Sequence, residues 1–228
     1  MALGQVPQFM PRIARIVVPN CPHHVIQRGN RRQKVFFYDA DRVLYLQLLR
    51  QQGERCGISF LCYCLMENHV HMVAVPKFSW SLTRGLGEAH RKYTSSVNIR
   101  ENWKGHLWQG RFISYPLDEK HFYYAVRYIE QNPVRAGIVQ KAEDYSWSSA
   151  KAHVYKMDDI LVSDCRLFGG IEDWTSFLSE APGESEIALI RNHELSGRPL
   201  GDESFIKQLE NAAGRILSLR KRGRKRGN

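Results

Sequence analysis

Apolar residues gather along the chain in runs whose periods predict alternating strands and helices. The runs "ISFLCYCLM" (58–66) and "HVHMVAV" (69–75) have the character of strands. Glu67 and Asn68 separate them, which is typical of a hairpin turn. Two further strands are expected over 23–30 and 107–117.

Between these runs, apolar positions recur at the spacing of an α-helix. Helices are expected over 41–55, 79–99, 118–132 and 204–219. Asp39 is the expected N-cap of the first helix, and Gly57 is expected to end it. Pro133 ends the third helix, because the residue before a proline is disfavoured in helical geometry.

The resulting order is β-α-β-β-α-β followed by a helix. It predicts an α+β fold with a ferredoxin-like or RRM-like antiparallel sheet, helices on one face, a C-terminal helical extension and a basic tail. The expected division is a catalytic domain over 10–145, a helical or irregular extension over 146–219, and a disordered basic tail over 220–228. The same sheet also serves RNA-recognition modules, so the fold alone does not select a function.

The net charge of the chain says more about its partner than its length does. The 228 residues carry a formal charge of +10, with six cations in the C-terminal "RKRGRKRGN". Such a surface favours a nucleic-acid partner, because cations that neutralise phosphates release counterions. The alternative for the tail is a merely solubilising end.

The remaining composition points to a cytoplasmic protein. No apolar run reaches the roughly 20 residues that span a bilayer, and the N-terminal residues lack the pattern of a signal peptide. Five cysteines without a disulfide-like framework suit a reducing compartment. Cys62 and Cys64 are either core residues or a zinc site, although their spacing is short for tetrahedral zinc.

The histidine pair in "ENHVHMVAV" is the first candidate for chemistry. Side chains alternate across a strand, so His69 and His71 point to one face, about 6–7 Å apart, with Val70 and Met72 on the other. Two imidazoles in this arrangement can converge on one divalent cation. Two ligands are few, however, and histidines that bind no metal are the alternative interpretation.

The helix over 118–132 offers the groups that the histidine pair lacks. Tyr128 and Asn132 are four residues apart and therefore share a face. They could bring a nucleophile and a third ligand oxygen to the same ion. Gln131 is the competing amide, and helical phase favours Asn132. The alternative is that Tyr124 and Tyr128 only pack.

Several motifs together resemble a known family. "ENHVHMV" resembles the His-hydrophobic-His motif of the HUH endonucleases, and "RYIEQNPVRAGIV" (127–139) resembles the nucleophile helix of their single-tyrosine branch. "HHVIQRGNRRQKVFF", "LWQGRF", "DYSWSSAKAH" and "GRPLGDESF" follow in the order of the REP-associated tyrosine transposases, which are relatives of the insertion-sequence transposases. The resemblance spans about residues 12–210.

The resemblance implies a metal-dependent DNA strand-transferase. His69 and His71, with Asn132, would bind Mg²⁺ or Mn²⁺, and Tyr128 rather than Tyr124 would attack the scissile phosphate. The products would be a 5′-phosphotyrosine and a free 3′-OH, and a second DNA end would resolve the link. Insertion-sequence relatives carry glutamine where this chain has Asn132. The implied substrate is single-stranded, hairpin-forming REP DNA, processed by a monomer or a homodimer.

Basic residues near these motifs are the expected DNA contacts. They are Arg28, Arg31, Arg32, Lys34, Arg91, Lys92 and Arg111. "WKGHLWQGR" (103–111) interleaves cations with aromatic rings, a mixture that suits unpaired bases. Trp103 and Trp108 are either stacking or core residues, and core is preferred for Trp108.

Two other functions fit the same sequence. A non-catalytic nucleic-acid-binding regulator would keep its DNA affinity and have no activity for Tyr128→Phe to remove. A water-using nuclease would cleave without a covalent adduct and would tolerate that substitution.

Overall fold

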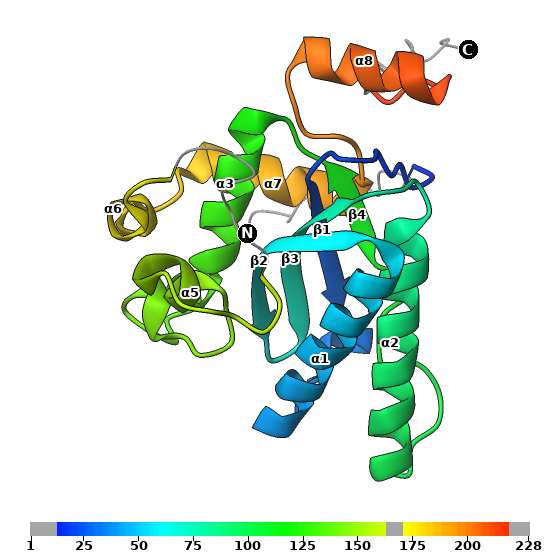
Figure 1. Cartoon of the computed structure of the whole chain (residues 1–228), viewed down its shortest axis with the longest axis vertical. Coiled ribbons are helices and arrows are strands. Elements are labelled where there is room, and N and C mark those ends of the chain that lie inside the picture. Colours follow the sequence, from blue (N-terminus) through cyan, green and yellow to red (C-terminus); the bar gives the residue numbers. More distant parts are fainter. Residues whose placement is uncertain (1–12, 163–170, 219–228) are drawn as a thin grey trace, which may run out of the picture.

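The computed structural model describes residues 13–162 and 171–218. Its strands are β1 (His23–Arg28), β2 (Ile58–Met66), β3 (His69–Pro76) and β4 (Ile113–Pro116). Its longer helices are α1 (Asp39–Cys56), α2 (Ser81–Arg100), α3 (Glu119–Glu130), α7 (Glu184–Ser196) and α8 (Glu203–Ala213) (Figure 1). The short helical segments are η1 (Asn30–Arg32), α4 (Asn132–Arg135), η2 (Ala142–Asp144), α5 (Ala150–Tyr155) and α6 (Trp174–Ser179). The basic tail predicted over 220–228 lies outside the described residues.

The four strands form one antiparallel sheet in the order β2-β3-β1-β4. This arrangement confirms the predicted ferredoxin-like fold. In the register of β1 with β3, Arg28 lies opposite His69 and Ile26 lies opposite His71. The two histidines therefore begin the central strand β3 next to the end of β1.

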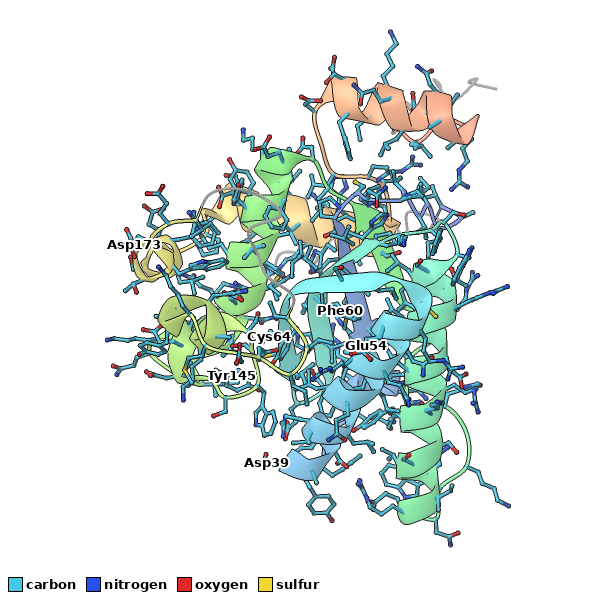
Figure 2. The ribbon with its side chains drawn as sticks, viewed as in Figure 1. Asp39, Glu54, Phe60, Cys64, Tyr145 and Asp173 are labelled. Atoms are coloured by element: carbon cyan, nitrogen blue, oxygen red, sulfur yellow. The ribbon has the colours of Figure 1, made fainter. Side chains whose placement is uncertain are left out.

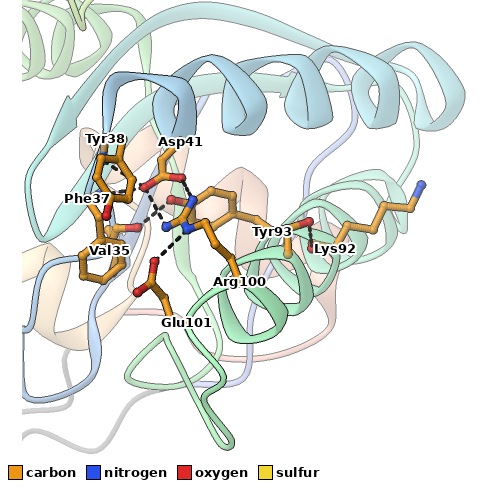
Figure 3. A network of polar contacts seen from close by, with 9 residues as sticks. Val35, Phe37, Tyr38, Asp41, Lys92, Tyr93, Arg100 and Glu101 are labelled. Atoms are coloured by element: carbon orange, nitrogen blue, oxygen red, sulfur yellow. Dashed lines mark hydrogen bonds and ion pairs between the residues drawn. The ribbon is translucent and has the colours of Figure 1, made fainter.

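Helices α1 and α2 cover one face of the sheet, as predicted. Val70 and Met72 point from β3 into the core that these helices close. At the outer end of the two helices, Asp41 accepts hydrogen bonds from the backbone amides of Phe37 and Tyr38 and pairs with Arg100 of α2 (Figure 3). Burial works against the charge of Asp41, but these bonds outweigh it and hold its pKa below the ordinary value.

Helices α3 and α7 cover the opposite face, which builds a second core (Figure 1). Ile26 and Val73 point into it from the central strands. A bulge at Leu61 interrupts the alternation of β2, so that Leu61 and Cys62 both lie in this second core. Cys62 and Cys64 are buried in this second core as apolar residues, which agrees with the core alternative for this pair.

The outer edge of β2 is paired with the chain that follows α4. Leu65 donates its backbone N–H to Trp147, and the Tyr145 hydroxyl donates to the carbonyl of Leu65. Figure 2 shows Cys64 and Tyr145 close together at this edge. Pairing of this kind removes the open backbone groups that would otherwise invite another strand.

Several predicted boundaries were wrong in detail. The helix expected over 118–132 ends at Glu130, and Pro133 does not stop helical structure but lies in the first turn of α4, where a proline needs no amide hydrogen. The strand expected over 107–117 is confined to β4, because the chain at Trp108 bridges Gly29 instead of continuing the ladder to β1. Tyr38, not Asp39, is the N-cap of α1, since Asp41 reaches back to satisfy the free amides. The last helix ends at Ala213, because Gly214 adopts a left-handed conformation (φ 61°).

Candidate active site

The two histidines of β3 lie side by side on the face that α3 and α7 cover. The ring centroids of His69 and His71 are 5.1 Å apart. His71 is 1% exposed, whereas His69 lies at the rim and is half-buried. Burial lowers the pKa of His69 to about 4, helped by the nearby cations Arg28 and Arg135. Both rings are therefore neutral at neutral pH, which is the form that binds metals.

Hydrogen bonds at Nδ1 orient both rings. His69 Nδ1 lies 2.6 Å from Asn68 Oδ1, and His71 Nδ1 lies 3.0 Å from His24 Nε2. The Nδ1 of His24 in turn lies 2.7 Å from the hydroxyl of Tyr115 on β4. Nδ1 is engaged in both histidines of the pair, which leaves Nε2 as the nitrogen available to an ion.

A carboxylate from the C-terminal extension joins these rings. Glu194 of α7 is buried, and its Oε1 lies 3.8 Å from His71 Nδ1. Its Oε2 forms an ion pair with Arg28 at 3.5 Å. Burial raises the pKa of Glu194, and Oε1 has no hydrogen-bond partner among the described residues.

These groups fit a divalent cation. Within the described residues, His24, His71 and Glu194 offer ligand atoms that all lie within 4.8 Å of one another. An unpartnered buried carboxylate oxygen is the donor that Mg²⁺ and Mn²⁺ prefer, and it stands here beside neutral imidazoles. Sequence reasoning missed both His24 and Glu194. The "HHV" run offered a weak signal for His24, and no motif pointed to Glu194.

Tyr128 faces this cluster from the last turn of α3. Asp118 caps the start of this helix by accepting from the amide of His121. The Tyr128 ring centroid lies 5.7 Å from that of His71 and 6.2 Å from that of His24. A helix and a strand far apart in the sequence thus bring the phenol and the imidazoles together.

Some groups around Tyr128 oppose the ionisation of its hydroxyl, and others favour it. Its side chain is 5% exposed, and burial together with the charge of Glu194 raises its pKa. Two cations act in the other direction. The guanidinium of Arg135 lies 4.1 Å from the ring centroid, and the charges of Arg135 and of Arg191 on α7 act to lower the pKa of the Tyr128 hydroxyl. These arginines would stabilise a phenolate or a phosphate in its place.

The two candidate amides behave differently. Gln131 turns away from the histidines, and its side chain donates to the carbonyl oxygens of Leu178 and Glu180. Asn132 begins α4 at the turn after Tyr128 and is half-buried. Its side chain makes no hydrogen bond to the histidines in the described structure. Gln131 is thus already engaged elsewhere, and Asn132 stays the predicted third ligand.

The predicted DNA contacts fall into two groups. Arg28 lies in the site, and the exposed residues Arg31, Arg32 and Lys34 follow it in the adjoining loop. Arg111 is exposed two residues before β4. Arg91 and Lys92 lie on α2, so the sheet separates them from the histidines, and Arg91 pairs with Glu88.

Comparisons with known proteins complete the description of the site. The family model described as "Transposase IS200 like" matches residues 17–132, slightly more than half of the chain. No curated protein matches. No helix in the described segments is long and apolar enough to cross a membrane.

Two solved structures resemble this one. A REP-associated tyrosine transposase bound to a REP hairpin is 17% identical, with a TM-score of 0.55 over 68% of this chain and 93% of that chain. A candidate transposase from Deinococcus radiodurans is 20% identical, with a TM-score of 0.37 over 53% of this chain and 97% of its own. The first match shows a shared fold.

Proposed function

Because the chain belongs to the IS200-like transposase family, we propose that it cleaves and rejoins single-stranded, hairpin-forming DNA of the REP type. The neighbour of similar fold is bound to a REP hairpin, and the basic composition of this chain suits the same kind of partner. We further place its action in the cytoplasm, as a monomer or a homodimer.

The observation that carries the proposal is the meeting of Tyr128 with the histidines. The Tyr128 oxygen attacks phosphorus, the bond from phosphorus to the 3′ oxygen breaks, and that oxygen takes up a proton. The products are a 5′-phosphotyrosine and a free 3′-OH. Arg135 and Arg191 offset the negative charge that develops around the phenol oxygen.

A divalent cation belongs to the same proposal. His69 and His71 would hold Mg²⁺ or Mn²⁺ through their Nε2 atoms, with Asn132 supplying a third ligand. Glu194 lies beside Nδ1 of His71 and would add negative charge close to the ion. When bound, such an ion offsets charge on the phosphate and aligns it for attack. The hydrogen bonds that Asn68 Oδ1 and His24 Nε2 accept from the two Nδ1–H groups keep the imidazoles in the orientation that binding needs.

The test is a covalent adduct. The protein is incubated with end-labelled single-stranded hairpin DNA, with Mg²⁺ or with a chelator, and resolved under denaturing conditions. We expect an adduct that needs the ion and that Tyr128→Phe abolishes. Tyr124→Phe, one turn earlier on α3, is the matched control and should retain the adduct. Cleavage without an adduct, surviving Tyr128→Phe, would reveal a water-using nuclease instead.

One observation favours a second candidate function. Tyr128 is buried beneath Arg191 and Glu194 of α7, which would suit a non-catalytic single-stranded DNA-binding regulator. That function predicts equal DNA affinity for wild type and Tyr128→Phe, with neither cleavage nor adduct from either protein. The same gel therefore separates the two candidates.

A further inference from the structure

Two loops form one surface at the end of the sheet where the histidines lie. We call residues 29–38 and 101–111 the two-loop platform. Asn30 donates its backbone N–H to the carbonyl of Leu107 at 2.8 Å, and the side chain of Gln33 donates to the same oxygen at 3.2 Å. The bonds make a single surface of two segments that are distant in the sequence.

Asn68 connects the platform to the candidate active site. Its amide nitrogen donates to the carbonyl of Arg32 at 3.1 Å, and its Oδ1 lies 2.6 Å from Nδ1 of His69. Gly29 also donates its backbone N–H to the carbonyl of Asn68. The first of the two loops therefore begins at the end of the sheet where His69 lies.

Two exposed aromatic rings lie on the platform, and each is held by contact with a neighbouring side chain. Trp103 is 45% exposed and rests edge-on against Phe37, with ring centroids 5.4 Å apart. Tyr38 is 59% exposed, and the guanidinium of Arg100 lies 5.0 Å from its ring centroid. The ion pair with Asp41 holds that guanidinium in place (Figure 3). Trp108, in contrast, is buried, so only one tryptophan of this loop offers its face to solvent.

The backbone beneath these rings is strained. Arg31 (φ 50°), Arg32 (φ 61°) and Asn102 (φ 52°) adopt left-handed conformations without being glycine. Such conformations raise the free energy of a folded chain and gather at binding and catalytic sites. Arg31, Arg32 and Lys104 are exposed in the same two loops, so the platform carries cations as well as aromatic rings.

We propose that the two-loop platform binds the unpaired stretch of the DNA, with Trp103 and Tyr38 stacking on bases while Arg31 and Arg32 contact phosphates. Aromatic faces stack on any base, and flanking cations follow the backbone, which is how unpaired strands are commonly held. The proposal rests on the proposed function for its assumption that single-stranded DNA is the substrate.

The test compares two exposed tryptophans at opposite ends of α2. Affinity is measured by fluorescence anisotropy, without divalent ions, for a labelled hairpin carrying an unpaired flank and for the same hairpin without it. Trp103→Ala should weaken binding of the flanked hairpin about 5- to 150-fold and leave the flank-free hairpin unchanged. Trp103→Phe should retain most of the affinity. Trp80→Ala, at the other end of the helix, should change neither.

The possible results separate this inference from the proposed function. Wild-type affinity in Trp103→Ala, or an equal loss for both hairpins, overturns the platform even where wild type forms the covalent adduct. If Trp103→Ala loses affinity only for the flanked hairpin, while wild type forms no covalent adduct, the platform is supported and only the proposed chemistry is overturned. Far-ultraviolet circular dichroism and the melting temperature establish that each variant is folded.

Discussion

His24 is a buried imidazole that lies 3.0 Å from His71, a proposed metal ligand, without belonging to the His-hydrophobic-His motif. Burial lowers its pKa to about 3, so the ring is neutral near pH 7. With its proton on Nδ1, directed to the Tyr115 oxygen, its Nε2 accepts from Nδ1–H of His71. His71 is then held in the tautomer whose Nε2 is unprotonated, which makes His24 and Tyr115 positioning residues.

This arrangement predicts that His24→Ala lowers the affinity of the DNA-free protein for Mn²⁺ by about 10- to 100-fold. Tyr115→Phe should lower it in the same direction, and isothermal titration calorimetry measures both. His23→Ala is the matched control, because the neighbouring ring is equally buried but bonds to Val18 and Cys21. Equal affinities in the His23 and His24 variants would contradict the assignment.

Helix α3, which carries the proposed nucleophile Tyr128, is attached at its last turn to the start of α5 and to the edge strand β2. Glu130, two residues after Tyr128, is fully buried, and its Oε1 accepts from Ser149 Oγ and lies 2.7 Å from Nδ1 of His153. Ser149 Oγ also accepts from the backbone N–H of Tyr63 at 2.9 Å. One hydroxyl therefore connects three elements around the turn that places Tyr128.

Because of these contacts, Ser149→Ala should reduce the free energy of unfolding by about 1–3 kcal/mol, since it leaves buried polar groups without a partner. Ser96→Ala serves as the comparison, because Ser96 is exposed on α2 and bonds only to its own helix. Its effect should stay within about 0.5 kcal/mol. Urea denaturation measures both, and similar values for the two variants would speak against the role of Ser149.

Across the whole molecule, buried histidines accompany both cores. His90 lies between α1 and α2, where its Nε2 is 2.8 Å from the hydroxyl of Tyr45. Burial lowers the pKa of His90 to about 3 and that of His23 to about 4. In the unfolded chain both titrate near 6.5. Below that pH the unfolded state binds more protons than the folded state, so acid favours unfolding.

The free energy of unfolding should therefore fall as the pH drops from about 6.5 towards 4, by up to about 1.4 kcal/mol per pH unit for each buried histidine. Above about pH 7 the contribution of these groups is constant. Urea denaturation at pH 7, 6 and 5 measures the slope. His90→Gln should reduce this slope by the contribution of one histidine, up to about 1.4 kcal/mol per pH unit. An unchanged slope would mean that His90 does not contribute.

Local patterns predicted most of the sheet and one half of the site. The alternation in "HVHMVAV" placed His69 and His71 on one face of a strand and Val70 in the core, and the structure agrees. The predicted ends of the elements were less accurate. The strand expected over 107–117 was too long, for example, because Trp108 pairs with Gly29 through a contact that no local pattern encodes.

By itself, the sequence determined the order of elements, the family and the side of β3 on which the histidines lie. Those properties follow from residue period and short motifs, which act within a few positions. The sequence also favoured a core position for Trp108, and the structure agrees. Only the tertiary structure decided that Glu194 and Arg191 lie near Tyr128 and the histidines. Such contacts depend on how distant elements pack, and the spacing of residues along a chain does not specify that packing.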